Sequence, residues 1–481
     1  MDLGERDIMM NLTNGLAEFM QLENHKELFG LKATRKMSEL FNDCTLQYSP
    51  RHLLPIMPPK QQIRFREQAM IAAKKNKSAV YIHIPFCKQR CSYCNFCGYP
   101  SDLAMQEEYV DLLCQELSLI EDFEYYQSQM ISAVFIGGGS PSALNEDQLE
   151  RLLSKIRKVF LLESGCEFTF ESNITDFNEA KLAICLKYGV NRFSFGVQTF
   201  STDLRRKLGR LAEQKVIVEK LKSLAQTGVN VIVDLIYGLP GQTMEDWQKD
   251  LEFLLQCNVT GVDLYKLQRF PHSILEEKLK TRAYPPCPAA DERMKLYERG
   301  ASYLQENAWQ QLSCCHFTCG EKDKRLYNKL AKNGSDIFAF GAGAGGSIGE
   351  LEYIQVRDLN AYKKKVEKQE KPFAMVFQRD HFSSLFAKIS GQLDCGYLDL
   401  DGLEKSYAIE LKPGLLPYMK LWENQGLCIS KNNDIMLTTH GKYWMRWIAR
   451  FILCGLQYAI YGAENSQNKQ MSMMSEMMNL R

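Results

Sequence analysis

Three closely spaced cysteines are the part of this sequence best suited to chemistry. Cys87, Cys91 and Cys94 follow one another as Cys-x3-Cys-x2-Cys, directly after an apolar segment that predicts a β-strand. Three thiolates on one loop can each ligate one iron of a cubane iron–sulfur cluster, which leaves the fourth iron without a protein ligand. An open metal position can chelate a small molecule that carries an amine and a carboxylate. The spacing therefore predicts a [4Fe–4S] cluster that binds such a molecule, and S-adenosylmethionine (SAM) has both groups.

The chain has 16 cysteines, so packing, zinc and disulfides are the alternatives. Disulfides are not expected, because no stretch resembles a signal peptide and a chain of this length does not need such cross-links. Zinc sites usually pair one Cys-x2-Cys with a second, distant pair. Most remaining cysteines lie among apolar neighbours and are interpreted as buried thiols: Cys44, Cys114, Cys166, Cys185, Cys257, Cys395, Cys428 and Cys454. Cys97 stays open between a spare thiol and one that takes part in the mechanism.

The composition predicts a soluble enzyme with a small partner. Hydrophobic residues make up 45% and charged residues 24% of the 481 residues, and 59 basic side chains balance 58 acidic ones. A net charge of +1 gives no overall attraction to nucleic acid or to an anionic membrane. No stretch reaches the apolar length of a membrane-spanning helix. We therefore expect a cytoplasmic protein with no nucleic-acid partner and no membrane span.

Strands and helices alternate through the middle of the chain. The predicted strands are 79–84, 132–136, 166–171, 191–196, 230–236 and 261–267, and the predicted helices are 102–125, 146–160, 178–188, 214–227 and 245–257. Gly189 and Gly228 stand where a helix ends in a left-handed residue, and Asn145 and Thr243 stand where a helix start is capped. Repeated strand–helix–strand units give right-handed crossovers and a parallel sheet. The pattern predicts an α/β fold with a partial (β/α)6 barrel, similar to part of a TIM barrel.

Such barrels carry their chemistry on the loops that follow the strands. The cysteine loop follows the first predicted strand, and Gly137, Gly138 and Gly139 follow the second. Without side chains these glycines let backbone amides approach a ligand, although a simple turn is the alternative. Glu171 ends the third strand, where its carboxylate could accept hydrogen bonds from two ribose hydroxyls.

Three further polar residues follow or interrupt the later strands. Gln198 ends the fourth strand, and Arg210 comes twelve residues after it. Asp234 lies inside the otherwise apolar fifth strand. A buried carboxylate is costly without a partner, so Asp234 is a site candidate, with structural hydrogen bonding as the alternative.

Together these motifs resemble the radical SAM superfamily and, within it, the oxygen-independent coproporphyrinogen dehydrogenase family and its relatives. The likeness rests on the HIPFC, GGGSP, GVQTF and DLIYGLPGQT segments at 83–87, 137–141, 196–200 and 234–243. It implies that the glycine loop faces the amino group of SAM and that Glu171, Gln198, Arg210 and Asp234 hold SAM. The likeness is strong over residues 79–267 and looser up to about residue 460.

Three branches of that family compete: porphyrinogen decarboxylation, haem delivery by a chaperone, and anaerobic haem degradation by methyltransferases. The glycine-rich turn at 341–347, the segment 437–444, and His316 followed by Tyr327 and Asn328 resemble the haem-degrading branch. The Arg-x-His usual in the family is absent, because Leu211 and Ala212 follow Arg210. The resemblance implies that SAM, cleaved at the reduced cluster, activates a second SAM that methylates and opens haem and frees its iron.

The same resemblance suggests the partners, namely haem or a related tetrapyrrole and an electron donor such as flavodoxin. An apolar slot for haem requires cations for the propionates and could include an iron ligand. His316 is the first candidate for a haem-binding or proton-transfer role and His440 the second. A lone histidine is more often structural, and Cys314 and Cys315 beside His316 are either reactive or packing thiols.

The expected organisation has five parts. An N-terminal extension (1–78) with a proline-rich segment at 53–59 precedes the core barrel (79–270), which is followed by an extension of the core (271–412). Residues 413–460 resemble a winged-helix module. Its second helix carries Lys442, Arg446 and Arg450 among apolar residues, which favours packing over contact with phosphates. The methionine-rich end (461–481) is expected to be disordered.

Overall fold

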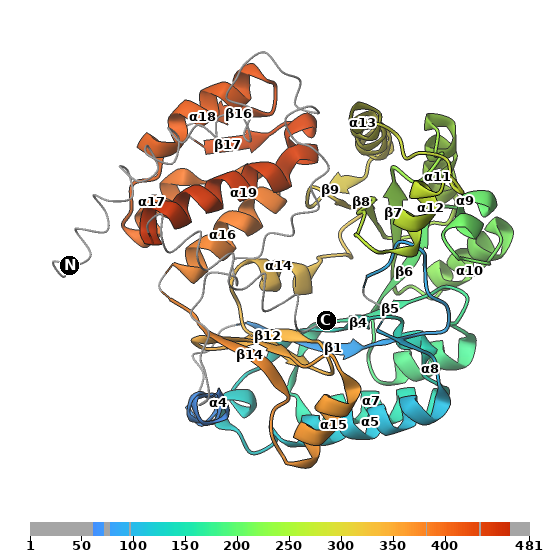
Figure 1. The fold of residues 1–481 in the computed structure, drawn as a ribbon, viewed down its shortest axis with the longest axis vertical. Helices are drawn as coiled ribbons and strands as arrows, with labels where there is room; N and C mark the ends of the chain where they lie inside the picture. Colours follow the sequence, from blue (N-terminus) through green and yellow to red (C-terminus); the bar gives the residue numbers. More distant parts are fainter. Residues whose placement is uncertain (1–60, 72–76, 96–97, 381, 432–433, 462–481) are drawn as a thin grey trace.

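The computed structural model describes residues 61–71, 77–95, 98–380, 382–431 and 434–461. Within them, the main body is a sheet in the order β11-β1-β4-β5-β6-β7-β8-β10-β9 (Figure 1). Its strands are β1 (Ser78–Ile84), β4 (Ile131–Gly138), β5 (Leu162–Ser172), β6 (Arg192–Gln198), β7 (Asn230–Tyr237), β8 (Gly261–Lys266), β9 (Gln310–Gln311), β10 (His316–Thr318) and β11 (Ile337–Phe340). All neighbours from β11 to β8 are parallel. The six predicted strands therefore form one parallel sheet, and the predicted partial barrel is confirmed.

The sheet is wider than the sequence predicted. β11 adds a parallel strand beside β1, and β10 adds an antiparallel one beside β8, with His316 opposite Asp263. Both strands are short, and β10 is half polar, so their own patterns are too weak to indicate strands. Pairing with the longer strands β1 and β8 determines the conformation of these two short strands.

Helices between the strands cover the outer face of the sheet (Figure 1). They are α5 (Leu103–Ser118), α6 (Glu124–Gln127), α7 (Glu146–Val159), α8 (Glu179–Lys187), α9 (Thr202–Lys207), α10 (Gln214–Gln226), α11 (Met244–Gln256), α12 (Ile274–Lys280) and α13 (Ala290–Glu306), with a 3-10 turn at Pro141–Ala143. Asn145 and Thr243 form capping boxes at the starts of α7 and α11. Gly189 and Gly228 have φ of +87° and +81°, so all four predicted helix boundaries are confirmed.

The single helix predicted over 102–125 is wrong. α5 ends at Ser118, and a short α6 begins at Glu124. The break lets both Tyr125 and Tyr126 be buried against the ring of Phe338, with centroids 6.2 and 4.5 Å apart.

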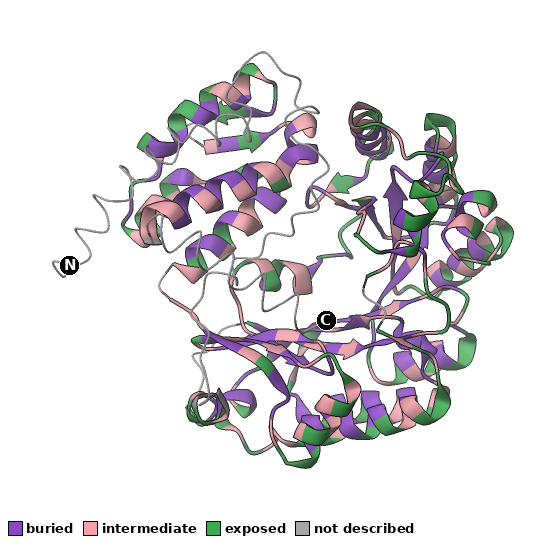
Figure 2. Cartoon of the chain, in the orientation of Figure 1, coloured by how far each residue is buried: buried purple, intermediate pink, exposed green. Residues whose placement is uncertain are grey.

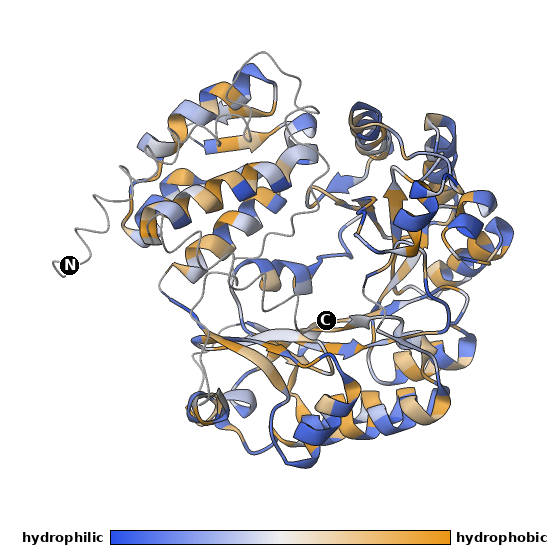
Figure 3. Cartoon of the chain, viewed as in Figure 1, coloured by the Kyte–Doolittle hydropathy of each residue, from blue (hydrophilic) through white to orange (hydrophobic). Residues whose placement is uncertain are grey.

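The remaining elements lie on both sides of the sheet, and α4 (Gln61–Ala69) and α15 (Leu359–Glu367) pack against the outer helices α6 and α5. α14 (Leu326–Lys332) packs on β1 and β4, and a small antiparallel sheet of β12 (Gly345–Ile348), β13 (Leu351–Gln355) and β14 (Phe373–Gln378) lies beside α4 and α15. Buried and apolar residues gather on the strands and on the helix faces that meet them (Figures 2 and 3). We call the face of the sheet turned away from α5, α7, α8, α10 and α11 the inner face.

The C-terminal region contains the helix, strand pair and helix that the sequence predicted. α18 (Lys412–Asn424), β16 (Cys428–Lys431), β17 (Asp434–Leu437) and α19 (Thr439–Tyr461) follow α16 (Ser383–Asp394), β15 (Tyr397–Leu398) and α17 (Leu400–Tyr407). Trp444 on α19 is buried, and Lys266 of β8 lies over its ring. Lys442 donates to Gln311 at 2.8 Å. The start of α19 thus packs on the core.

Several predictions fall outside the described residues. These are Cys44, Cys97, the proline-rich segment at 53–59 and the methionine-rich end from 462 onward. Cys395 is exposed, so its interpretation as a buried thiol is wrong, whereas Cys166, Cys185, Cys257 and Cys428 are buried. No helix in the described ranges is long and apolar enough to cross a membrane.

Candidate active site

The cysteine loop begins directly after β1. Its start is fixed by the short parallel pair β2 (Phe86–Cys87) and β3 (Tyr99–Pro100). Its middle is fixed by Ser92, whose N–H donates to the Leu208 carbonyl at 3.0 Å and whose own carbonyl accepts from the Leu275 N–H at 2.8 Å. The backbone of the loop is therefore held from both sides by the segments after β6 and β8.

Cys87, Cys91 and Cys94 are partly exposed cysteines on this loop. Within the described part of the chain, no three His, Cys, Asp or Glu side chains converge as ligands of a single metal ion. A cubane cluster does not require such convergence, because each thiolate binds a different iron and the thiolates spread around it. A loop with three accessible thiols fits a [4Fe–4S] cluster.

The three glycines at the end of β4 are required by close contacts. A Cβ at Gly137 would lie 2.3 Å from Glu171 Oε2, one at Gly138 would lie 2.6 Å from the His83 ring, and one at Gly139 would lie 2.6 Å from the Phe86 carbonyl. Gly138 also has a φ of +116°. The loop therefore packs tightly against the strand that leads into the cysteine loop.

The hydrogen bonds of this loop correct one expectation. The N–H groups of Gly138, Gly139 and Ser140 already donate to Glu171 Oε2, the Ile84 carbonyl and the Phe86 carbonyl at 3.1, 2.8 and 2.7 Å. Backbone amides of these residues are therefore not available to a ligand. The loop can still offer carbonyl oxygens, which suit a ligand that donates, such as an ammonium group.

Glu171 and Asp234 bring carboxylates to the inner face. Both are partly exposed, and Glu171 Oε2 accepts from the Gly138 N–H at 3.1 Å. Burial raises the pKa of Glu171 to about 7. Burial, the neighbouring Asp263 and Glu171 raise the pKa of Asp234 well above its usual value. Because carboxylates so placed are costly without a donor, both are suited to accept from a bound polar ligand.

Gln198 and Arg210 converge on Gly196. A Cβ at Gly196 would lie 2.7 Å from Gln198 Nε2 and 3.3 Å from Arg210 Nη2. Arg210 Nη1 donates to the Gly196 carbonyl at 2.5 Å and Nη2 to the Tyr93 hydroxyl at 3.4 Å, while its buried Nε has no partner among the described residues. Arg210 thus connects the end of β6 to Tyr93, which lies between two of the cysteines.

The predicted site residues therefore gather at one edge of the sheet. The cysteine loop, the glycine loop, Glu171, Gln198 and Arg210 all follow neighbouring parallel strands, and Asp234 lies in the next one. The glycine positions that a side chain would obstruct, the buried Arg210 Nε and the three partly exposed cysteines fit a cluster together with a polar, charged ligand such as SAM.

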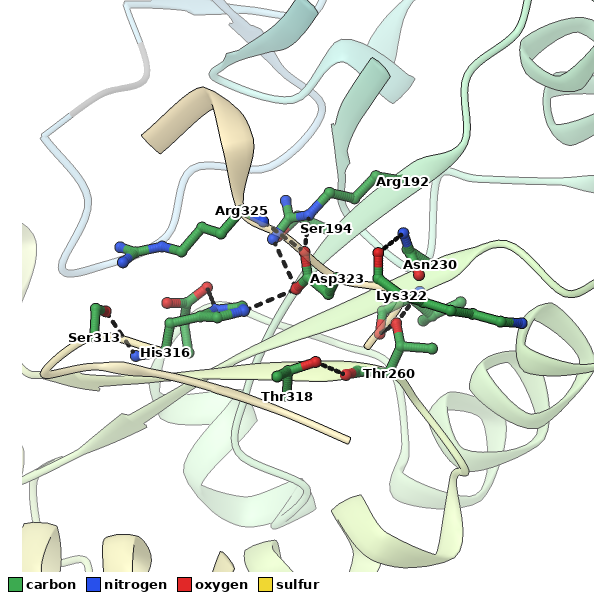
Figure 4. A network of polar contacts seen from close by, with 12 residues as sticks. Arg192, Ser194, Asn230, Thr260, Ser313, His316, Thr318, Lys322, Asp323 and Arg325 are labelled. Carbon is green, nitrogen blue, oxygen red and sulfur yellow. Dashed lines mark hydrogen bonds and ion pairs between the residues drawn. The ribbon is translucent and has the colours of Figure 1, made fainter. Parts of the chain in front are cut away.

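His316 lies on β10, and its neighbour Asp263 on β8 separates it from Asp234 on β7. His316 is fully buried, with Nε2 2.7 Å from Asp323 and Nδ1 3.1 Å from Asp263. Asp323 is in turn paired with Arg192 at 2.9 Å (Figure 4). Burial by itself lowers the pKa of His316, but the two carboxylates outweigh it and raise the pKa. With both ring nitrogens facing carboxylates, His316 is not arranged to bind a haem iron. The position instead favours the structural alternative.

We expect His316→Gln to lower the free energy of unfolding by about 3 kcal/mol at pH 6, as when one partner of a buried ion pair is removed. Because the pKa is raised in the folded protein, this contribution is complete below the ordinary value of 6.5 and declines as pH rises through the raised value. Denaturant unfolding at pH 6 and pH 9 measures it. His440→Gln is the control, since His440 pairs with Glu298 at the surface and contributes less than about 1 kcal/mol. Equal effects of the two substitutions would contradict a buried ion network.

The sequence singled out Tyr327 and the segment that contains His83, but not Tyr81 and Phe135, which lie beside them. Tyr81 donates to, or accepts from, His83 Nδ1 at 2.8 Å, and burial lowers the pKa of His83 to about 4. Phe135 and Tyr327 lie next to Tyr81. Side chains alternate between the two faces along β1 and β4, and this alternation indicates that Tyr81 and Phe135 share the inner face. Tyr327 lies on α14, and only the position of α14 explains how it reaches these two rings.

A parallel sheet with these loops at its carboxyl edge defines a radical SAM protein, and residues 81–254 match the radical SAM superfamily. Anaerobilin synthase of Escherichia coli O157:H7 is 31% identical over 84% of this chain and 90% of its own length. The haem chaperone HemW of Bacillus subtilis is 30% identical over 76% of this chain and 96% of its own length. The structure of coproporphyrinogen III oxidase (HemN) from Escherichia coli covers 81% of this chain and 92% of its own, with a TM-score of 0.70 and 22% identity, which shows a common fold.

The chain belongs to the radical SAM superfamily and, within it, to the coproporphyrinogen dehydrogenase-like family that includes anaerobilin synthase and HemW. It is a radical SAM enzyme whose cofactors are a [4Fe–4S] cluster and SAM. The predicted family and cofactors are thereby confirmed.

Proposed function

We propose that this enzyme methylates and opens the haem macrocycle and so releases its iron. The observation that carries the proposal is the likeness to anaerobilin synthase, which extends over 84% of this chain and 90% of the relative. A likeness over 412 residues extends well beyond residues 81–254, the segment that matches the superfamily.

We assign the binding of the cofactors to the residues that the fold gathers. Cys87, Cys91 and Cys94 would ligate the cluster, and the cluster with SAM supplies a carbon-centred radical by one-electron reduction of the sulfonium. The carbonyls of the glycine loop would accept from the amino group of SAM. Glu171 would accept from the ribose, with Gln198, Arg210 and Asp234 completing the contacts.

A group of neighbouring aromatic rings, which we call the aromatic shelf, favours a flat conjugated substrate. Tyr81, Phe135 and Tyr327 form it, with ring centroids 4.7 to 6.2 Å apart and interplanar angles of 30 to 32°. All three rings remain partly exposed. A Cβ at Gly137 would lie 2.8 Å from Phe135, so the shelf adjoins the glycine loop. A macrocycle on these rings would stack by dispersion and quadrupole attraction close to the SAM site.

A haem chaperone is the second candidate, because HemW of Bacillus subtilis is similar over 96% of its own length. The two candidates bind the same ligand and differ only in turnover. Oxidative decarboxylation of coproporphyrinogen is the third candidate and is supported by fold alone.

The test is anaerobic incubation of the reconstituted enzyme with haem, SAM and a flavodoxin-type reductant. We expect loss of the haem Soret band, a linear methylated tetrapyrrole detected by mass spectrometry and free iron, all dependent on SAM. Cys91→Ala protein is the control for non-enzymatic bleaching. Intact haem that passes to an acceptor protein would support the chaperone, and carbon dioxide from coproporphyrinogen would support decarboxylation. Either outcome with intact haem would sink the proposal.

A further inference from the structure

Arg205 is a fully buried cation without a carboxylate partner among the described residues. Its side chain lies in α9, one turn after the end of β6, and is 0% exposed. It donates from Nη1 to the Val197 carbonyl and, at 3.3 Å, to the Thr199 carbonyl, and from Nε to the Ala212 carbonyl at 2.9 Å. Burial of a guanidinium has a large desolvation free energy. The presence of a buried arginine that donates to carbonyls, and not to a carboxylate among the described residues, therefore needs a reason.

The backbone that Arg205 holds has an unusual conformation. Gln198 has a φ of +72°, which is uncommon for a residue with a side chain, and the pairing of β6 with β7 shifts between Gly196 and Gln198. Such a bulge redirects the side chain that follows it. Arg205 binds the carbonyls on both sides of Gln198, so it fixes the bulge where the strain is stored.

Asp250 on α11 holds the same segment from the other side. One of its carboxylate oxygens accepts from the Thr199 hydroxyl at 3.0 Å and from the Phe200 N–H at 2.6 Å. In this segment the carbonyls of Val197 and Thr199 therefore accept from the Arg205 cation. The Thr199 hydroxyl and the Phe200 N–H donate to the Asp250 anion. The two buried charges thus hold one stretch of backbone from opposite sides, while Arg205 Nη2 and Asp250 Oδ2 have no hydrogen-bond partner among the described residues.

Arg205 also connects this segment to Arg210 and to the cysteine loop. The Arg210 N–H donates to the Arg205 carbonyl at 2.9 Å. The end of the same short helix accepts from Ser92, through the Leu208 carbonyl at 3.0 Å and the Lys207 carbonyl at 3.3 Å. Three parts of the site, the Gln198 bulge, Arg210 and the cysteine loop, therefore meet at the turn that contains Arg205.

We infer that Arg205 is a positioning residue that holds Gln198 and Arg210 in the orientation in which they bind SAM beside the cluster. The inference rests on the assignment of these two residues to SAM, but not on the identity of the substrate. Arg205 itself touches neither the cofactor nor the substrate in this role.

The experiment compares Arg205→Met and Arg205→Lys with Arg206→Met as the matched control. Arg206 is the next residue of the same helix, is largely exposed and pairs with Asp203 and Glu213 at the surface. Each protein is reconstituted anaerobically, and its iron and sulfide content and melting temperature are measured. SAM affinity is then measured by calorimetry without haem, and the electron paramagnetic resonance (EPR) spectrum of the reduced cluster is recorded with and without SAM.

We expect Arg205→Met to assemble the cluster but to bind SAM at least about 10-fold more weakly, with a reduced change of the EPR spectrum on addition of SAM. Arg205→Lys should recover part of the affinity, because an ammonium can reach fewer of the carbonyls. Arg206→Met should match the unmodified protein. Normal SAM affinity and a normal EPR change in folded Arg205→Met would overturn the inference.

A second variant covers the case in which Arg205→Met does not fold. Thr199→Val removes the hydroxyl that donates a hydrogen bond to Asp250 while keeping the size of the side chain. Like Arg205→Met, it should weaken SAM binding. Unchanged affinity in both Thr199→Val and Arg205→Lys would also overturn the inference. SAM binding is measured without haem. These outcomes therefore test the role of Arg205 even if the enzyme proves not to degrade haem.

Discussion

Cys91→Ala is expected to abolish the cluster and, with it, all SAM cleavage. In the proposed assignment each of the three cysteines would supply the single protein ligand of one iron, so the loss of any of them would leave two irons open and the cubane exposed to loss of iron. Cys91 is the central cysteine, next to Ser92, whose bonds to Leu208 and Leu275 fix the loop. Iron and sulfide analysis, the broad absorbance of the cluster and the release of methionine from SAM measure the effect.

Two cysteines outside the trio serve as controls. Cys319→Ala removes an exposed thiol at the end of β10 and should leave the cluster unchanged. Cys97→Ala should also leave the cluster assembled, because three ligands are already present. A full complement of iron in Cys91→Ala protein, or its loss in Cys97→Ala protein, would show that the ligands have been assigned wrongly.

Gly137→Ala is expected to weaken SAM binding by about 30-fold or more while the cluster still assembles. The new Cβ would lie 2.3 Å from Glu171 Oε2 and 2.8 Å from Phe135, so Glu171 has to move away from the site. Loss of one hydrogen bond to a charged group costs about 2 kcal/mol, which corresponds to this change in affinity. Calorimetry with SAM measures it, and the iron content shows whether the fold and the cysteine loop persist.

Gly165→Ala is the matched control for this substitution. Gly165 lies on β5, the strand that carries Glu171, and a Cβ there meets nothing within 4 Å. It should therefore bind SAM as the unmodified protein does. If Gly137→Ala also bound SAM normally, Glu171 would not be a SAM ligand, and its raised pKa would reflect burial alone.

The sequence predicted the core sheet well because its strands are long and apolar and its helices are marked by caps. Asn145, Thr243, Gly189 and Gly228 each act through their immediate neighbours, so local chemistry determines these boundaries. The helix over 102–125 was wrong because the burial of Tyr125 and Tyr126 against Phe338 depends on β11, which comes two hundred residues later.

The candidate site residues also divide into those set by local sequence and those set by contacts between distant elements. Cys87, Glu171 and Arg210 stand next to strand ends or in local motifs, so parallel pairing brings them together. His316 has no such local context. Its surroundings come from Asp263 on β8 and from Asp323, and only the paired strands bring these groups into contact (Figure 4).

The amino-acid order alone determined the cysteine trio, the glycine loop and the alternation of strand and helix, because spacing and periodicity are properties of neighbouring residues. Only the tertiary structure decided that His316 is enclosed by carboxylates, that Tyr327 joins Tyr81 and Phe135, and that Arg205 holds the backbone around Gln198. These contacts join separate elements, and their energies depend on burial and on distances that no local pattern encodes.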